Sequence, residues 1–134
     1  MKNDAKEIAG IAKEIFQQEE AILFCYLFGS RAVGRAIPTS DVDVAVYLDK
    51  KLCGDFFEKR LDLIVKFSKL LKKETDVLIL NTAFPFLRYV VLKEGKLIFD
   101  RDESQRIDFE LKSINEYFDF RPVLEKYNNR LLIS

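Results

Sequence analysis

Two aspartates separated by one residue are the part of the sequence best suited to chemistry. Asp41 and Asp43 open the segment Asp41–Leu48, in which apolar and polar residues alternate as they do in a strand. At positions i and i+2 of a strand, both carboxylates lie on the same face, about 7 Å apart. A divalent cation between them would remove the cost of burying their charge, because Mg²⁺ prefers hard oxygen ligands. An isolated Asp-x-Asp pair is more often a solvated strand face, so the neighbouring residues decide its meaning.

A glycine and a serine at the end of an apolar run provide the second feature. Residues 21–28 are all apolar or aromatic, which predicts a strand buried on both faces, and Gly29 and Ser30 end this run. Glycine lets a phosphate approach the backbone closely, and a helix start offers free N–H groups to an anion. Ser30 can donate to a phosphate oxygen, and Arg31 and Arg35 are candidate partners for a polyphosphate. Each feature alone is more often a turn or a solvated side chain, but together they predict a phosphate loop.

The composition restricts the possible chemistry. The chain has 134 residues, no histidine, and 22 basic against 22 acidic side chains. Without histidine, Ser-His-Asp and Cys-His nucleophiles and His-ligated metal sites are excluded. The balanced charge argues against direct nucleic-acid binding. The polar N-terminus and the lack of an apolar run of about 18–20 residues predict a soluble, cytoplasmic protein without membrane contact.

Hydrophobic periodicity predicts the elements that position these residues. The length suits a single domain over residues 1–134, in which about 101–134 forms a C-terminal helical segment interrupted near Pro122. The alternation of helices and strands favours an α/β (α+β) fold. The elements are expected as follows: helices over 4–20, 56–72 and 82–93, and strands over 21–28, 41–48, 76–80 and 96–99.

Two apolar stretches could serve either the core or an interface. Phe57, Leu61, Ile64 and Phe67 recur at helical spacing, which predicts a face packed in the core. Residues 117–133 are aromatic and apolar for a chain end. Core packing is the expected explanation for this segment, and a subunit interface is the second.

The combined motif resembles that of a known superfamily. Gly29-Ser30, ten intervening residues and Asp41-x-Asp43 resemble the signature of the DNA polymerase beta-type nucleotidyltransferases. The longer string Gly-Ser-Arg-Ala-x-Gly…Ser-Asp-x-Asp is similar to their minimal nucleotidyltransferase (MNT) branch, which includes the MntA-type antitoxins of HEPN/MNT toxin–antitoxin pairs. The segments 75–81 and 92–99 are also similar to family segments, so the resemblance covers most of the chain. It implies a small nucleotidyltransferase fold with a short mixed sheet.

The resemblance implies a role for each residue of the motif. Gly29 and Ser30 would hold the triphosphate of ATP, and Asp41 and Asp43 would bind two Mg²⁺ ions. Two metals about 3.5–4 Å apart can activate an attacking hydroxyl and neutralise the departing pyrophosphate. Catalysis of this kind is mainly positioning and charge stabilisation, so it does not require histidine.

A third acidic residue follows from the same resemblance. Asp76 would ligate the second metal and accept the proton of the acceptor hydroxyl. The alternative for Asp76 is an ordinary strand-opening residue, and Glu74 and Asp62 are competing acids.

The acceptor is expected to be a protein. The nucleotidyltransferase core uses nearly all of the chain, which leaves only C-terminal helices for an acceptor. The resemblance implies a HEPN ribonuclease toxin that receives AMP on a tyrosine hydroxyl and is thereby silenced. Two alternatives remain open: an antitoxin that acts only by forming a tight complex, and a nucleotidyltransferase that modifies a small molecule or a tRNA end.

Overall fold

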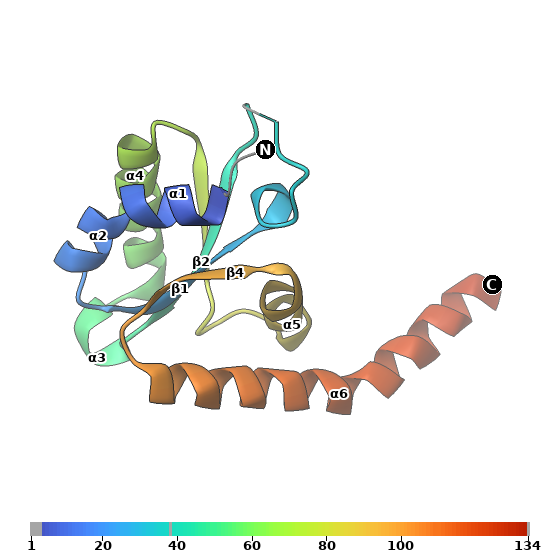
Figure 1. Ribbon diagram of the computed structural model, residues 1–134. Coiled ribbons are helices and arrows are strands. Elements are labelled where there is room, and N and C mark those ends of the chain that lie inside the picture. Colours follow the sequence, from blue (N-terminus) through green and yellow to red (C-terminus); the bar gives the residue numbers. More distant parts are fainter. Residues whose placement is uncertain (1–3, 38, 134) are drawn as a thin grey trace.

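A mixed sheet lies between two layers of helices (Figure 1). The computed structural model describes residues 4–37 and 39–133, with side chains up to Tyr127. In this part of the chain the sheet has four strands in the order β3-β2-β1-β4. Strand β1 is antiparallel to β2 and β4, whereas β2 and β3 are parallel. The strands are β1 (Ile22–Phe28), β2 (Val42–Leu48), β3 (Thr75–Ile79) and β4 (Lys96–Asp100). The predicted mixed sheet flanked by helices is therefore confirmed.

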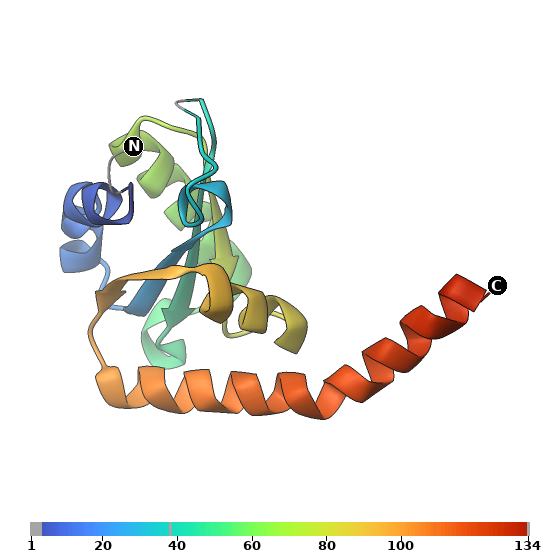
Figure 2. The ribbon, with the colours of Figure 1, turned by 45° about the vertical axis from the view of Figure 1, so that its right-hand side comes forward.

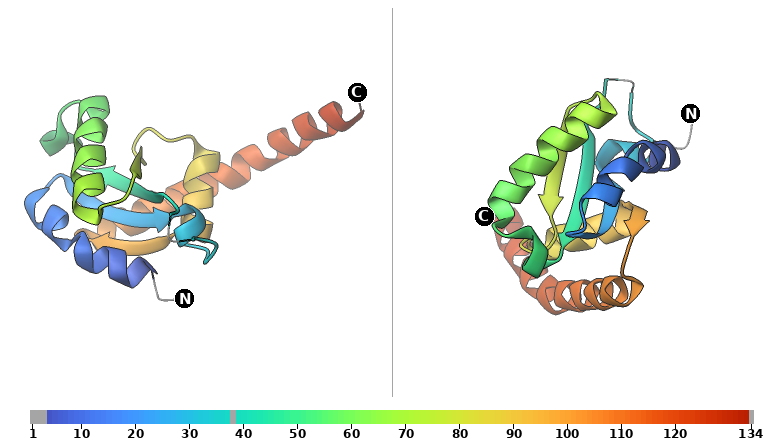
Figure 3. Two further views of the ribbon diagram at one scale, coloured as in Figure 1. Left: turned by 90° about the horizontal axis from the view of Figure 1, so that it is seen from above. Right: turned by 90° about the vertical axis from the view of Figure 1, so that its left-hand side faces the viewer.

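Helices cover both faces of the sheet (Figure 3). Helices α1, α2 and α4 pack on one face, and α5 and the first half of α6 pack on the other. The helices are α1 (Asp4–Ile11), α2 (Lys13–Gln18), the single-turn η1 (Gly29–Arg31), α3 (Lys50–Cys53), α4 (Phe56–Leu71), α5 (Pro85–Glu94) and α6 (Glu103–Ile133). No helix of the described residues is long and apolar enough to cross a membrane.

Strand β1 supplies side chains to the cores on both faces of the sheet. Cys25 and Leu27 pack with the α1, α2 and α4 layer, and Phe24 and Tyr26 pack with the α5 and α6 layer. All four side chains are buried. Successive residues of a strand face opposite sides of the sheet, and here both sides are covered by helices. The run of apolar residues is therefore explained by burial of β1 on both faces, as the sequence predicted.

The predicted N-terminal helix is divided into two. Helix α1 ends at Ile11 and α2 begins at Lys13. At the junction, the N–H of Ile15 donates to the carbonyl of Ala12 at 2.9 Å, a tighter turn than that of a regular α-helix. Ala12, Ile15 and Phe16 are buried in the core.

The predicted apolar stripe on α4 was wrong in part. Phe67 is buried and Ile64 packs against the core, but Phe57 is 66% exposed and Leu61 is 46% exposed. The buried face instead follows Leu63, Phe67 and Leu71. The helix is capped by Asp55, whose carboxylate accepts from the N–H of Glu58 at 3.0 Å. The observed face is thus turned away from the predicted one by part of a helical turn.

The C-terminal segment also differs from the expectation of core packing. Helix α6 continues through Pro122 without interruption, and its second half leaves the body of the molecule (Figure 2). Phe118, Phe120 and Tyr127 are exposed, so this part of the segment is not core. Tyr117 stacks on Tyr89 of α5, with 3.8 Å between ring centroids. The side chains of residues 131–133 lie outside the described part.

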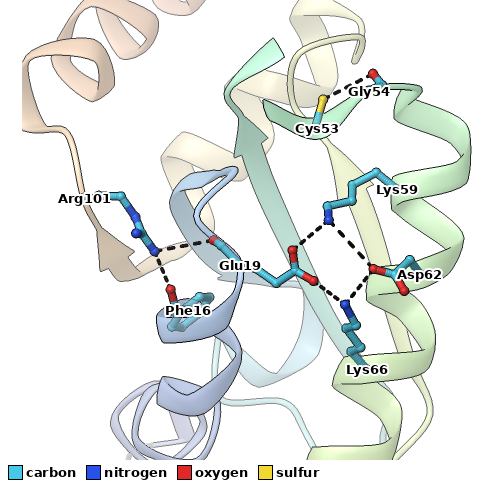
Figure 4. A network of polar contacts seen from close by, with 8 residues as sticks. All are labelled: Phe16, Glu19, Cys53, Gly54, Lys59, Asp62, Lys66 and Arg101. Carbon is cyan, nitrogen blue, oxygen red and sulfur yellow. Dashed lines mark hydrogen bonds and ion pairs between the residues drawn. The ribbon is translucent and has the colours of Figure 1, made fainter. Parts of the chain in front are cut away.

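A charged cluster joins α4 to the end of α2 (Figure 4). Glu19 is buried and accepts hydrogen bonds from Lys59, at 2.7 Å, and from Lys66. Burial raises the pKa of Glu19, but the hydrogen bonds from the two lysines outweigh it, and the pKa lies below its usual value. Asp62 joins the cluster through Lys66 at 2.9 Å. Asp62 therefore has a structural role, as an ion-pair partner of Lys66 on the same helix.

Candidate active site

Strand register brings the predicted site residues to one end of the sheet. Phe28, the last residue of β1, pairs with Asp43 of β2, and Asp43 pairs with Asp76 of β3. Because β1 runs antiparallel to β2, its end lies beside the beginnings of β2 and β3. Gly29 and Ser30 therefore follow β1 at the same sheet end as the carboxylates.

A side chain at position 29 would displace the carboxylate of Asp43. The φ of Gly29 is +76°, and a Cβ built on it would lie 2.5 Å from Oδ2 of Asp43. Glycine meets both conditions, because it has no Cβ and adopts positive φ readily. The loop then continues as the single turn η1, in which the N–H of Ala32 donates to the carbonyl of Gly29 at 3.1 Å. The residues that follow β1 thus form one turn of 3₁₀ helix, which begins at Gly29 itself.

The two arginines after Ser30 have different surroundings. Arg31 is buried, and its Nη2 donates to the carbonyl of Ser40 at 2.7 Å. Its Nη1 also lies 3.5 Å from the carboxylate of Asp4 in α1. Arg31 therefore anchors the loop before Asp41, whereas Arg35 is exposed. Contact of either arginine with a nucleotide stays a prediction.

The pKa of Asp43 is affected by the other two predicted carboxylates. Burial raises the pKa of Asp43 above its usual value, and the negative charges of Asp76 and Asp41 raise it further. Asp43 is partly buried, while Asp41 and Asp76 are exposed. Three carboxylates are a suitable ligand set for Mg²⁺. Among the side chains that the structure describes, in residues 4–37 and 39–127, no three of Asp, Glu, Cys or His are already gathered as a metal site.

Among the candidate acids, Asp76 lies beside Asp43. The two residues share a register position on neighbouring strands, which lie about 4.8 Å apart. Glu74 precedes β3 and is exposed, and its carbonyl accepts from the N–H of Val42 at 2.9 Å. Asp62 belongs to the cluster with Lys66 on α4. The geometry therefore supports Asp76 as the third carboxylate, and its catalytic role stays a prediction.

Arg60 is a site residue that the sequence analysis did not identify. Its Nη2 lies 2.7 Å from Oδ1 of Asp76, and its Nε donates to the carbonyl of Val77 at 2.7 Å. The N–H of Val77 also donates to Oδ1 of Asp76 at 3.0 Å. Two donors thus hold Oδ1. A signal was present in the sequence, because Arg60 is a charged residue between Phe56 and Leu63 on the apolar side of a helix.

Comparison with known proteins identifies the family. Residues 11–104 match the family Polymerase beta, Nucleotidyltransferase, and the chain belongs to this family. No curated protein matches the chain. The prediction of a nucleotidyltransferase of this superfamily is therefore confirmed.

Solved structures share the fold over nearly the whole chain. A crystal structure of a toxin–antitoxin with AMP-PNP is 22% identical and covers 92% of this chain and 98% of its own, with a TM-score of 0.79. A tri-AMPylated Shewanella oneidensis HEPN toxin in complex with MNT antitoxin is 19% identical. The match covers 96% of this chain and 98% of that chain, with a TM-score of 0.75. The toxin–antitoxin MntA-HepT is 20% identical. The match covers 96% of this chain and 97% of that chain, with a TM-score of 0.70. At these identities the likeness shows the fold.

Proposed function

We propose that this chain is an antitoxin that transfers AMP from ATP to a tyrosine hydroxyl of a HEPN toxin and so neutralises it. The observation that carries the proposal is the meeting of Gly29-Ser30 with Asp41, Asp43 and Asp76 at one sheet end. A phosphate loop beside a carboxylate cluster suits nucleotidyl transfer, since both the donor phosphates and the metals have a place.

Each residue has a distinct task in this reaction. The Gly29 backbone leaves room for the phosphates, and the Ser30 hydroxyl donates to a phosphate oxygen. Asp41, Asp43 and Asp76 would hold two Mg²⁺ ions, which when bound activate the acceptor and neutralise the leaving pyrophosphate. Asp76 also accepts the proton of the acceptor hydroxyl. Exposed Arg35 is a candidate contact for the outer phosphates.

The solved structures of similar fold support the donor and the acceptor. One is a toxin–antitoxin with AMP-PNP, an ATP analogue, and another contains a tri-AMPylated HEPN toxin with its MNT antitoxin. The present chain covers 98% of each of these chains, so the comparison extends over the complete fold. A cytoplasmic location, where ATP and a ribonuclease target would be present, belongs to the same proposal.

Incubation with labelled ATP, Mg²⁺ and the partner HEPN protein tests the proposal. We expect label on the wild-type partner and none on a partner whose acceptor tyrosine is replaced by phenylalanine. A folded wild-type pair that acquires no label would contradict the proposed reaction.

A double variant separates catalysis from mere binding. The exposed aromatic residues in the second half of α6, among them Phe118 and Tyr127, give the binding-only alternative a contact surface. Asp41→Ala with Asp43→Ala should retain the fold and lose both AMP transfer and neutralisation. Neutralisation retained by this variant would favour an antitoxin that acts by complex formation alone.

A further inference from the structure

We infer that the second half of α6 is a docking arm, which binds the acceptor protein while the acceptor hydroxyl lies at the sheet end that carries Asp43 and Asp76. This inference rests on the proposed function and adds to it a second contact surface, away from the reacting atoms. The arm consists of residues 118–133, and its side chains are described up to Tyr127.

Helix α6 runs toward the sheet end that carries the candidate site. Strand β1 ends there, whereas β4, which is antiparallel to β1, ends at the opposite sheet end, where α6 begins. Near the start of α6, Arg106 donates to Asp100 at 2.6 Å, and four residues later Glu110 accepts from the hydroxyl of Tyr26. Asp100 pairs with Phe24 of β1, two residues before Tyr26. The helix therefore advances in the direction of β1.

The arm extends past this sheet end. Gly29 follows Tyr26 by three residues, about 10 Å of extended strand, which corresponds to about seven residues of helix after Glu110. The helix thus reaches the level of Gly29 near Tyr117, and residues 118–133 continue beyond it for about 24 Å. Figures 1 and 2 show that this half bends toward the side of α6 on which the sheet lies.

The side of α6 that packs on the body of the molecule continues along the arm as an exposed surface. In the first half of the helix, the buried Phe109 and Ser113 and the stacked Tyr117 share this side, at a spacing of four residues. A spacing of three to four residues then leads to Phe120, which is 48% exposed, to Leu124, and to Tyr127, which is 59% exposed. Over residues 118–127, every side chain except that of Leu124 is exposed.

The spacing of these side chains is typical of a helix that binds in an apolar groove. Such helices present anchors at positions i, i+3, i+4 and i+7. The arm has an apolar or aromatic side chain at each of these positions, which we call the stripe: Phe120, Val123, Leu124 and Tyr127. Phenylalanine and tyrosine are enriched in the buried centres of protein interfaces. The arm is therefore suited to a protein surface with an apolar groove.

The position of the stripe identifies the acceptor protein as its occupant. Because the stripe continues the packing side of α6, a molecule that covers it lies beside the sheet end with Asp43 and Asp76. A second copy of the chain in this place would compete with the acceptor for the space in front of the carboxylates. A folded domain of about 100 residues has a radius of gyration of about 13 Å, so it is large enough to contact the arm and the carboxylates together.

The experiment compares a variant of the stripe with two matched controls in the full chain. Phe120→Ala with Tyr127→Ala removes two exposed rings, and the arm should stay helical because alanine favours helix more than either residue. Phe57→Ala with Phe84→Ala removes two exposed rings away from the arm, and Lys126→Ala changes the arm outside the stripe. Far-UV circular dichroism checks that all variants are folded.

The measurements are kcat and KM for the HEPN partner at saturating ATP and Mg²⁺, the Kd of the complex without ATP, and sedimentation of the chain alone. We expect the stripe variant to raise KM and Kd about tenfold, the usual scale for loss of aromatic contacts at an interface. Its kcat should stay within about twofold of wild type, since the arm binds away from the reacting atoms. Both controls should behave as wild type.

Three outcomes would contradict the docking arm. Unchanged KM and Kd in the stripe variant, with an active wild type, would overturn the arm and leave the proposed function intact. A wild-type dimer that the stripe variant converts into a monomer would assign the stripe to a second copy of the chain and overturn the acceptor as its occupant. A wild-type protein that transfers no AMP to the partner would instead overturn the proposed function, and the acceptor as occupant with it.

Discussion

The two halves of the candidate site are held in place by different means. On the donor side, the backbone of Gly29 packs directly on the Asp43 carboxylate, and the buried Arg31 fastens the following loop. On the acceptor side, Asp76 is exposed on an edge strand and is held mainly by its ion pair with Arg60. The donor side is thus fixed by main-chain packing, and the acceptor side by a side-chain contact that solvent reaches.

This difference indicates which half can be changed without loss of the fold. A Cβ at Gly29 would lie 2.5 Å from Oδ2 of Asp43 and would displace the carboxylate, whereas an exposed ion pair contributes about 0–1 kcal/mol to stability. We therefore expect substitution of Gly29 on the donor side to affect both folding and reaction. Substitutions on the acceptor side should affect the reaction alone.

The largest effect is expected at Asp43. Asp43→Asn keeps the size of the side chain and its contact with Gly29, but removes the charge that a metal needs. AMP transfer should fall about a thousandfold, since the cation and its charge stabilisation are lost. Incorporation of labelled AMP into the partner measures this. Activity within tenfold of wild type would remove Asp43 from the metal-binding set.

Substitution of Gly29 should disturb folding and reaction together. In Gly29→Ala the new Cβ meets Oδ2 of Asp43 at a φ of +76°, which should cost about 1–2 kcal/mol in the free energy of unfolding. Transfer should fall because Asp43 has to move. The matched control is Gly10→Ala, where a Cβ meets no atom within 4 Å and helix formation should gain about 0.5–1 kcal/mol. Urea unfolding of Gly29→Ala and Gly10→Ala distinguishes these expectations. Equal changes in the free energy of unfolding would contradict the close packing of Gly29 on Asp43.

Arg60 provides the corresponding test on the acceptor side. Arg60→Gln should reduce AMP transfer about tenfold by releasing Asp76, with a change in unfolding free energy below about 1 kcal/mol. Arg60→Lys should be intermediate, because lysine restores the charge without the second donor to Val77. The rate of AMP transfer and the free energy of unfolding in urea, measured for both variants, test this prediction. A loss of stability as large as that of Gly29→Ala would show that the two halves are built alike.

The smallest expected effect is a pH dependence of stability from Asp43. Its folded-state pKa lies above the usual 3.8, so the native state binds the proton more tightly than the unfolded chain. The stabilising effect is complete below pH 3.8 and is lost as pH rises through the folded pKa. At neutral pH the metal-free Asp43→Asn variant should therefore melt slightly above wild type, with the difference shrinking under acid conditions. A lower melting temperature for the variant at pH 7 would contradict this sign.

The donor side could be predicted from the sequence because its signals are local. The apolar run of β1 has to be buried on both faces. The alternation in β2 places Asp43 on the face of the sheet opposite to that of Val42 and Val44. Gly29 ends the run at the position where β1 meets Asp43. Strand period and turn chemistry suffice for these assignments.

The acceptor side and the outer helices depend on contacts that periodicity does not reveal. On α4 the stripes through Leu61 and Leu63 are both plausible, and only packing against β3 selects Leu63. That rotation also brings Arg60 to Asp76 and leaves Phe57 exposed. On α6 the sequence shows that Phe118 and Tyr127 are hydrophobic, but not that this half of the helix lies beyond the sheet.

The close approach of Gly29 to Asp43 limits how such a chain can evolve. Every single-base change in a glycine codon that alters the residue introduces a Cβ, and here that atom meets the carboxylate. The loop and the strand must therefore change together. A change at Asp43 would relieve this steric restriction on Gly29, so the two positions are expected to vary together among related chains.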